Sequence, residues 1–373
     1  MAQAEVADIL QKARNYSSIK YKLIILDIIY IFVLLFLFTA LGISKILAGW
    51  LYLLTKNRFF VVPIYLGIIL ITYYLLDIPL NFYRSFVLEH KFCLSQQKIR
   101  DWLLDQFKSG IIAYVISLIL LGSFYYIFGH YAKTWWLIVS IFWISFSMIM
   151  ARLVPIIIIP MFFKYNLLAD KNLRVRIINL ASKMKVRILD VFEIDFSKKT
   201  LKANAAFVGW GATRRVILAD TLKDKYSYDE IEVILAHEFA HYRLRHLLKL
   251  ILINSLVTML TFYLIFITSD YALIFFGFSS LSEVAALPLI LMYFFIFGII
   301  TQPFQCYVSR VLERNADIMA LKVTGMRDAF ISAMDKLASQ NLSDRNPPRI
   351  IKFFFFDHPP IDERIALAKS FAK

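Results

Sequence analysis

The residues with the clearest chemical meaning form the motif His237-Glu238-Phe239-Ala240-His241. On a helix, residues four apart lie on one face, so both imidazoles can bind the same metal ion. Glu238 then lies beside the ion, where its carboxylate can take a proton from a water molecule. These residue types in this pattern are typical of zinc-assisted hydrolysis with Glu238 as the general base. The alternative is a chance pair of surface histidines on an amphipathic helix.

A catalytic zinc ion needs a third protein ligand, which the motif does not contain. His246 follows the first histidine by nine residues. That is about 180° around a continuous helix, so we expect it to face away. A carboxylate from a separate helix remains, and Glu313 is the candidate. Asp317 follows one turn later, where it can hydrogen-bond a ligand imidazole. The alternative for both carboxylates is a solvated helix with Arg310 and Arg314 as their partners.

The elements that must position these residues lie largely in a membrane. The chain has 373 residues, 60% of them hydrophobic, and its mean hydropathy is +0.64. Its apolar residues concentrate in runs near or above the roughly 20 residues that a bilayer core requires. We predict six spans, at residues 23–43, 59–82, 111–129, 135–163, 247–268 and 286–305. The apolar segment 41–54 is expected to be re-entrant or to lengthen the first span.

The helix that carries the motif has a clear start, because Ser227 and Glu230 match a capping box. Before it, residues 205–210 and 215–219 are predicted as strands that flank a turn at 211–214, so a hairpin precedes the helix. The same soluble block contains a further helix and strand, predicted at residues 174–185 and 191–196. The sequence therefore indicates a small α+β unit around the motif.

Membrane and soluble sections alternate along the chain. We expect a multi-pass α-helical membrane protein with an α+β catalytic domain. Its four sections are residues 1–163 with four spans, 164–246 with the hairpin and the motif helix, 247–305 with two further spans, and 306–373 with the third ligand.

The charge distribution predicts the orientation in the membrane. The net charge is +15, and segment 84–110 carries five Lys and Arg residues, whereas loop 130–134 carries one and segment 269–285 carries none. Basic residues collect on the cytoplasmic side, which places segment 84–110 and both soluble blocks there. We expect the basic side chains to meet anionic membrane lipid rather than nucleic acid, because no nucleic-acid-binding module is recognisable.

A rival interpretation is a transporter or channel. Asp27 and Asp77 lie within apolar runs, and membrane carboxylates usually face a cavity or a partner, although Asp77 also suits a position near the interface. Pro155 and Pro160 are expected to kink the fourth span. This interpretation leaves the metal motif and its downstream carboxylate unexplained, and no inverted repeat is visible.

The sequence resembles the integral membrane metalloproteases that act as CAAX prenyl proteases of the first type, the Ste24-like branch of the M48-type zincins. The likeness covers most of the chain from about residue 70 onward. It is carried by the segments LLDIPLNFYRSFVLEHKFCLSQQ, NAAFVGWGATRRVILADTL, ILAHEFAHYRLRH, SRVLERNADIMA and DHPPIDERI.

The resemblance implies roles for single residues. One Zn2+ ion would be bound by the two motif histidines and Glu313, and Asn204 would touch the substrate backbone. His358 and Arg364 would stabilise the tetrahedral intermediate or position a nearby carboxylate, and Asp317 would orient a ligand histidine. Without the resemblance, His358 also suits an exposed turn. Arg364 also suits an ion pair with one of its neighbours Asp362 and Glu363.

The resemblance also implies a fold, a location and a substrate class. The family fold is a barrel of membrane helices around a water-filled chamber, with the zinc site at its cytoplasmic end. Eukaryotic members have seven membrane helices, and we expect six or seven in this chain. We expect the bacterial inner membrane or the endoplasmic reticulum membrane, and peptide or protein substrates that include lipidated ones. Cys93 stands where the family usually has Gly, and Ala205-Ala206 replace an expected aromatic residue. A quality-control protease without prenyl specificity therefore stays open as the alternative.

Overall fold

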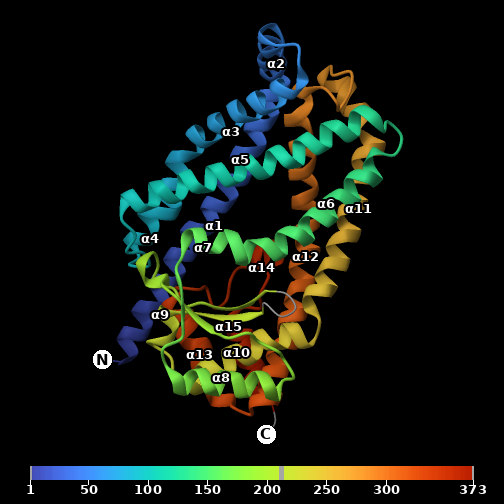
Figure 1. The fold of residues 1–373 in the computed structure, drawn as a ribbon. Coiled ribbons are helices and arrows are strands. Elements are labelled where there is room, and N and C mark those ends of the chain that lie inside the picture. Colours follow the sequence, from blue (N-terminus) through green and yellow to red (C-terminus); the bar gives the residue numbers. More distant parts are fainter. Residues whose placement is uncertain (1, 210–213, 372–373) are drawn as a thin grey trace.

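The membrane helices occupy one end of the molecule and the catalytic elements the other (Figure 1). The computed structural model describes residues 2–209 and 214–371. Within them, six helices are long and apolar enough to cross a membrane: Ala7–Ala40, Arg58–Lys91, Ile99–His130, Trp135–Phe162, His246–Phe276 and Val284–Thr324. The prediction of six spans is thereby confirmed, and the chain is a multi-pass membrane protein.

The elements of the membrane region follow one another with short connections. They are α1 (Ala2–Ala40), α2 (Ile43–Leu54), α3 (Arg58–Phe82), the π-helical turn η1 (Tyr83–Val87), α4 (Leu88–Lys91), α5 (Ile99–His130), α6 (Trp135–Leu153), the π-helical turn η2 (Val154–Ile158), α7 (Ile159–Phe162), α11 (His246–Phe276), the short turn η5 (Val284–Ala286) and α12 (Leu287–Thr324). The predicted kink of the fourth span corresponds to η2, which contains Pro155.

Segment 41–54 does not lengthen the first span. Gly42 adopts a left-handed conformation with φ 70°, which ends α1 and starts the separate helix α2. With 12 residues, α2 is too short to cross a bilayer. It lies at the end farthest from the catalytic elements (Figure 1). There Ser44 Oγ lies 2.6 Å from Tyr65 Oη of α3, and Ser44 also hydrogen-bonds the carbonyl of Ala285.

The membrane carboxylate Asp27 has a partner within the protein. Arg84 of η1 donates a hydrogen bond to Asp27 of α1 and forms an ion pair with it. This contact joins two membrane segments, so it gives Asp27 a structural role that needs no transported ion.

The catalytic elements form a small sheet with helices packed against it. They are β1 (Tyr165–Leu167), α8 (Lys171–Lys183), β2 (Val191–Ile194), the short turn η3 (Phe196–Lys198), β3 (Ala205–Val208), β4 (Arg215–Ala219), α9 (Asp220–Lys223), α10 (Tyr228–Arg243), α13 (Arg327–Gln340), α14 (Arg349–Phe355) and α15 (Ile361–Ser370). The sheet order is β1-β2-β4-β3, with β2 and β4 parallel and the other pairs antiparallel.

The predicted hairpin is present, because β3 pairs with β4 in the register Ala205↔Leu218 to Val208↔Arg215. Its turn was predicted at residues 211–214, of which 211–213 lie outside the described part of the chain. The pairing leaves β3 at the edge of the sheet. Within the described residues, no strand pairs with its other side, which leaves that side for another extended chain.

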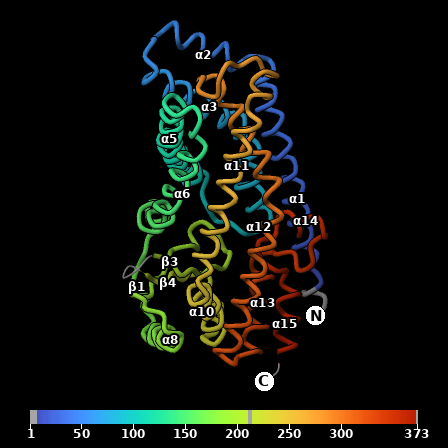
Figure 2. The backbone as a smooth tube through the Cα atoms, turned by 90° about the vertical axis from the view of Figure 1, so that its right-hand side faces the viewer, coloured from blue at the N-terminus to red at the C-terminus, as the bar shows by residue number. Residues whose placement is uncertain are grey.

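Helix α12 connects the membrane region with the catalytic elements. Its 38 residues correspond to a length of about 57 Å. In Figure 2 it runs from the membrane region down beside α10. The two helices are in contact, and both carry fully buried alanines, Ala236 and Ala240 on α10 and Ala316 and Ala320 on α12. Such small side chains let helix backbones approach closely.

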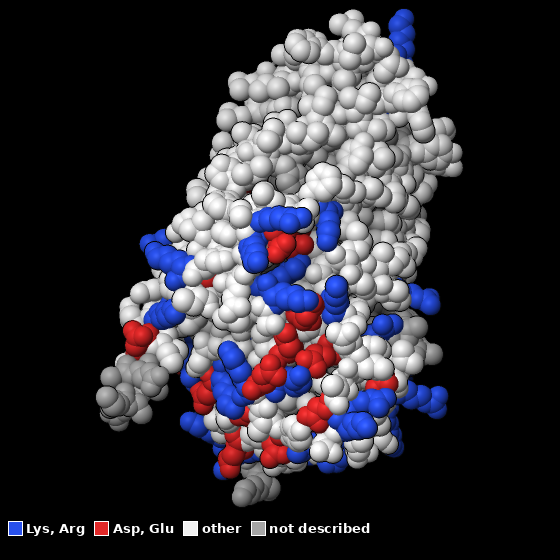
Figure 3. Space-filling view, turned by 60° about the vertical axis from the view of Figure 1, so that its left-hand side comes forward, with Lys and Arg blue, Asp and Glu red and all other residues white. Residues whose placement is uncertain are grey.

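Charged side chains gather at one end of the molecule. In Figure 3 the upper part of the visible face is almost uncharged, whereas Lys, Arg, Asp and Glu crowd the lower part. Basic side chains form a band where the two parts meet. Two separate hydrophobic cores match this division, one around the sheet and α10 and one among the membrane helices.

Candidate metal centre

The motif helix is fixed at its first turn. Ser227 Oγ accepts a hydrogen bond from the Glu230 backbone N–H at 3.3 Å, and the Glu230 carboxylate accepts one from the Ser227 N–H at 2.7 Å. The predicted capping box is therefore present. Ser332 and Lys336 of α13 also donate hydrogen bonds to Glu230, which anchors the start of α10 on α13.

Three potential ligand residues converge at the junction of α10 and α12. The Nε2 atoms of His237 and His241 lie 3.1 Å apart. Glu313 places Oε2 3.1 Å from the first and Oε1 3.3 Å from the second. Two ligand atoms that are each about 2.0–2.1 Å from a tetrahedral zinc ion lie about 3.3 Å from one another. The spacing of this cluster therefore fits a single ion.

The chemistry of the donor set also fits a metal. Glu313 is only 6% exposed, and the polar groups printed against its Oε2 atom are the imidazoles of His237 and His358, at 3.1 and 2.8 Å. A buried carboxylate is costly unless hydrogen bonds or a cation compensate its charge. Two imidazoles and one carboxylate are a ligand set that zinc enzymes use, because three protein ligands leave the fourth tetrahedral position to water or substrate. The solvated-helix alternative does not describe Glu313.

His237 is oriented by a buried carboxylate. Its Nδ1 atom lies 2.8 Å from Asp317 Oδ1, and Asp317 is 0% exposed. Burial lowers the pKa of His237, but the charge and hydrogen bond of Asp317 and the hydrogen bond of Glu313 outweigh it and raise this pKa to about 9. The pattern of carboxylate, histidine and candidate ion fixes the imidazole tautomer and makes the ligand more basic.

Arg364 lies behind this carboxylate. Its Nε and Nη2 atoms donate to the two oxygens of Asp317 at 2.8 and 2.6 Å. The neighbours considered as alternative partners bind other residues, because Asp362 pairs with Arg345 and Glu363 with Lys352. Arg364 is therefore placed to position a carboxylate, which is one of its two expected roles.

His246 does not face away as predicted. Helix α10 ends at Arg243, Arg245 adopts a left-handed conformation with φ 56°, and α11 begins at His246. This break turns the chain back, so that His246 Nδ1 lies 3.0 Å from His241 Nδ1. The prediction was wrong because it assumed one continuous helix through residue 246. No residue type in this segment would have indicated the break.

His358 reaches the cluster from the loop between α14 and α15. Its Nδ1 atom lies 2.8 Å from Glu313 Oε2, and 57% of the side chain is exposed. The hydrogen bond to Glu313 raises the pKa of His358. This histidine thus lies beside the candidate metal ligands and is open to an approaching substrate.

Glu238 lies next to His237 and is partly buried. Burial raises the pKa of its carboxyl group, and the positive charge on His237 opposes that shift. A carboxylate with a raised pKa holds a proton more readily, which suits a general base that must accept one and release it again.

Asn204 immediately precedes the edge strand. Its backbone carbonyl accepts a hydrogen bond from the Ala219 N–H at 3.0 Å, while its side chain is exposed. Further along β3, the Phe207 ring packs edge-on against Phe239 and Tyr242, with centroids 5.3 and 5.9 Å apart. These contacts hold the free edge of the sheet beside the motif helix.

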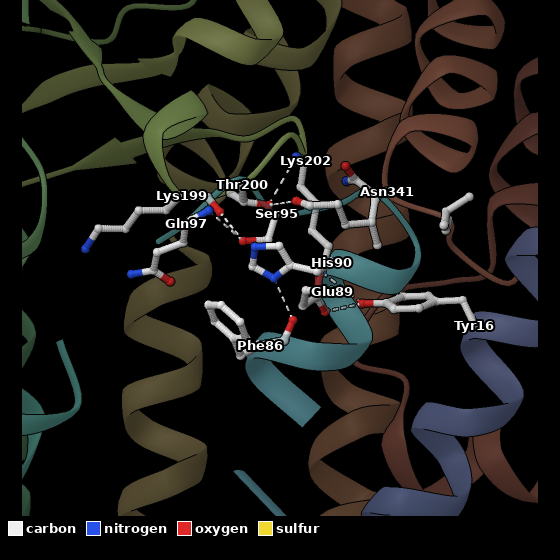
Figure 4. A network of polar contacts seen from close by, with 12 residues as sticks. Tyr16, Phe86, Glu89, His90, Ser95, Gln97, Lys199, Thr200, Lys202 and Asn341 are labelled. Carbon is white, nitrogen blue, oxygen red and sulfur yellow. Dashed lines mark hydrogen bonds and ion pairs between the residues drawn. The ribbon is translucent and has the colours of Figure 1, made fainter. Parts of the chain in front are cut away.

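A polar network fixes the segment that leads into β3 (Figure 4). Glu89 of α4 accepts a hydrogen bond from the Tyr16 hydroxyl of α1 and forms an ion pair of 2.8 Å with Lys202. Ser95 Oγ donates to the Lys199 carbonyl at 2.7 Å, and Asn341 Oδ1 accepts from the Ala203 N–H at 2.9 Å. The sequence did not indicate this network, because its members lie far apart along the chain.

Comparisons with known proteins agree with this architecture. The family model described as CAAX prenyl protease N-terminal, five membrane helices, matches residues 2–164, where the structure has four spanning helices and the shorter α2. The model for peptidase family M48 matches residues 168–372. The first match covers the four N-terminal spans, and the second includes the candidate metal centre.

Similar proteins match most of this chain. An uncharacterised metalloprotease of Bacillus subtilis, YhfN, is 29% identical over 96% of this chain and 85% of its own. CAAX prenyl protease 1 of Saccharomyces cerevisiae is 30% identical over 81% of this chain and 70% of its own. The crystal structure of Ste24p from S. mikatae superposes with a TM-score of 0.86 at 27% identity, covering 97% of this chain and 89% of that one. The chain therefore belongs to peptidase family M48 and is a membrane metalloprotease.

Proposed function

We propose that this chain is a zinc-dependent endopeptidase that cleaves membrane-associated proteins, prenylated CAAX-type proteins among them. The observation that carries the proposal is the convergence of His237, His241 and Glu313, whose ligand atoms lie within 4.8 Å of one another. We assign these residues as the zinc ligands. A bound zinc ion would polarise the scissile carbonyl and lower the pKa of a water molecule toward neutrality.

Glu238 is the general base in this proposal. Its carboxylate takes the proton from the attacking water and passes it to the leaving amine, which needs a group able to hold and then release a proton. Its raised pKa, caused by burial, supports this assignment. One residue can thus serve both proton transfers.

His358 and Arg364 divide the two roles expected for them. His358 is the donor for the oxyanion that develops on the substrate carbonyl, because it is exposed and its pKa is raised by Glu313. Arg364 is a positioning residue, because Asp317 occupies two of its nitrogens. Asp317 in turn holds His237 in the orientation that directs Nε2 toward the other ligands.

The substrate is proposed to bind as an added strand on β3. An extended peptide pairs readily with a free sheet edge, and β3 offers one beside α10. Asn204 lines a cavity of about 570 Å³ at the start of that edge. We assign its exposed amide to the substrate backbone.

We further propose that the catalytic elements face the cytoplasm, in the bacterial inner membrane or the endoplasmic reticulum membrane. The basic band at the border of the uncharged region supports this orientation (Figure 3), as do the five basic residues of segment 84–110. The division into sections 1–163, 164–246, 247–305 and 306–373 belongs to the same proposal.

The test compares a farnesylated CAAX peptide with its unmodified counterpart, using purified parent protein and Glu238→Gln. We expect the substitution to reduce the cleavage rate at least about 100-fold, because the amide cannot accept the proton. Activity that survives in Glu238→Gln would rule out the mechanism. Equal cleavage of both peptides would instead favour a quality-control protease without prenyl specificity.

A further inference from the structure

His246 is a buried histidine that none of the assignments above uses. It is 1% exposed, and its Nδ1 atom lies 3.0 Å from His241 Nδ1. On the other side of the His241 ring, Nε2 lies 3.3 Å from Glu313 Oε1. His241 is therefore held between the ligand cluster and a second imidazole.

The direction of this hydrogen bond decides whether His241 can bind a metal. A neutral imidazole carries one proton, and a nitrogen that binds a metal must be free of it. If His246 donated the hydrogen bond, the proton of His241 would lie on Nε2, the atom that faces Glu313. If His246 accepts it, the proton lies on His241 Nδ1 and Nε2 is free. Only the second arrangement is compatible with the proposed ligand set.

The surroundings of His246 show what this arrangement costs. When its Nδ1 accepts the hydrogen bond, its own proton lies on Nε2, and that atom is buried with no hydrogen-bond partner in the described structure. A residue retained for packing alone would avoid such a donor, since an apolar side chain fills the space without the desolvation penalty. Among the described residues, the contact with His241 is the hydrogen bond that the buried ring makes.

We propose that His246 is a positioning residue that accepts the Nδ1 proton of His241 and so keeps Nε2 of this ring available to the metal. The inference rests on the proposed zinc site and adds to it. The two histidine ligands are then oriented by different partners, His237 by the anionic Asp317 and His241 by a neutral imidazole. A neutral partner orients the ring without adding negative charge, so the ion keeps more of its capacity to polarise a carbonyl.

The test measures zinc affinity of the purified full chain by competition with a chelating dye. In His246→Phe the ring volume is kept but the acceptor is lost, and we expect about 10–100-fold weaker zinc binding. His246→Gln keeps an acceptor and should recover most of the affinity. The control is Ser269→Ala, which removes a buried hydroxyl from the same helix α11 and should leave the affinity unchanged.

Zinc binding by His246→Phe as tight as in the parent would overturn the inference, and so would a Gln variant as weak as Phe. A parent protein that binds no stoichiometric zinc would instead overturn the proposed function. If the Phe variant does not fold, an NMR measurement on the parent protein tests the inference. The chain has six histidines, and nitrogen-15 NMR of the zinc-loaded protein, assigned with the Gln variant, should place the His246 proton on Nε2. A proton on Nδ1 would contradict the inference.

Discussion

At the scale of single residues, the two candidate histidine ligands differ in their protonation. Burial lowers the pKa of His241 to about 4, and the nearby charge of His237 adds to the shift. His237 has a pKa of about 9, because Asp317 and Glu313 outweigh its burial. In metal-free protein at pH 7, His241 is therefore neutral and His237 is protonated.

This difference predicts how zinc binding depends on pH. Below about pH 9 the ion must displace the proton of His237, so apparent affinity rises with pH and about one proton is released per ion at pH 7. In the metal-free protein the raised pKa contributes stability that is full below about pH 6.5 and is lost as pH rises through about 9. Calorimetry of zinc binding in buffers of different ionisation enthalpy measures the proton count. Binding without proton release at pH 7 would contradict the assignment.

At the scale of elements, residues that are close in sequence were predictable and those joined across elements were not. The pair His237 and His241 followed from helical geometry, and the start of α10 followed from the capping box. Glu313 was proposed by elimination and by resemblance, because nothing local shows that α12 meets α10. His246 was misplaced because periodicity cannot reveal a left-handed residue such as Arg245. The pairing of Arg364 with Asp317 joins residues that lie 47 positions apart, on α15 and α12.

The ion pair between α15 and α12 predicts unequal costs for two similar substitutions. Asp317→Ala leaves the buried Arg364 guanidinium unpaired and should destabilise the protein by about 3–5 kcal/mol. Asp362→Ala removes a partner of Arg345 that is 54% exposed, and the loss should stay below about 1 kcal/mol. Unfolding of both metal-free variants in detergent, followed by tryptophan fluorescence, compares them without the contribution of zinc. Equal losses of unfolding free energy would show that the buried ion pair contributes no more to stability than the exposed one.

At the scale of the whole molecule, the number of spans and the separation into membrane and catalytic parts followed from hydropathy. The helix α2 and the polar network around Glu89 did not, because they depend on a single glycine conformation and on contacts between distant segments. Hydropathy shows which residues avoid water. It contains no information on which of the resulting helices touch.

The two cysteines make the proposed orientation measurable. Cys93, between α4 and α5, is exposed, whereas Cys306 is buried. A membrane-impermeant maleimide should label Cys93 only after the membrane is permeabilised and the reagent reaches the cytoplasmic face. Ala132→Cys, in the exposed loop between α5 and α6, should be labelled in intact cells, in a background where Cys93 is replaced by Ser. Labelling of Cys93 in intact cells would reverse the proposed orientation.

The continuity of α12 has a consequence for the setting in which this enzyme works. One end of this helix lies in the membrane region, and Glu313 lies beyond its midpoint toward the catalytic elements. A rotation of about 5° around that midpoint would move Glu313 by about 1 Å, because this residue is about 11 Å from the midpoint. That displacement is about half of a zinc–ligand bond of about 2 Å. Bilayer thickness influences the tilt of a span. The rate of hydrolysis should therefore depend on the acyl-chain length of the surrounding lipid.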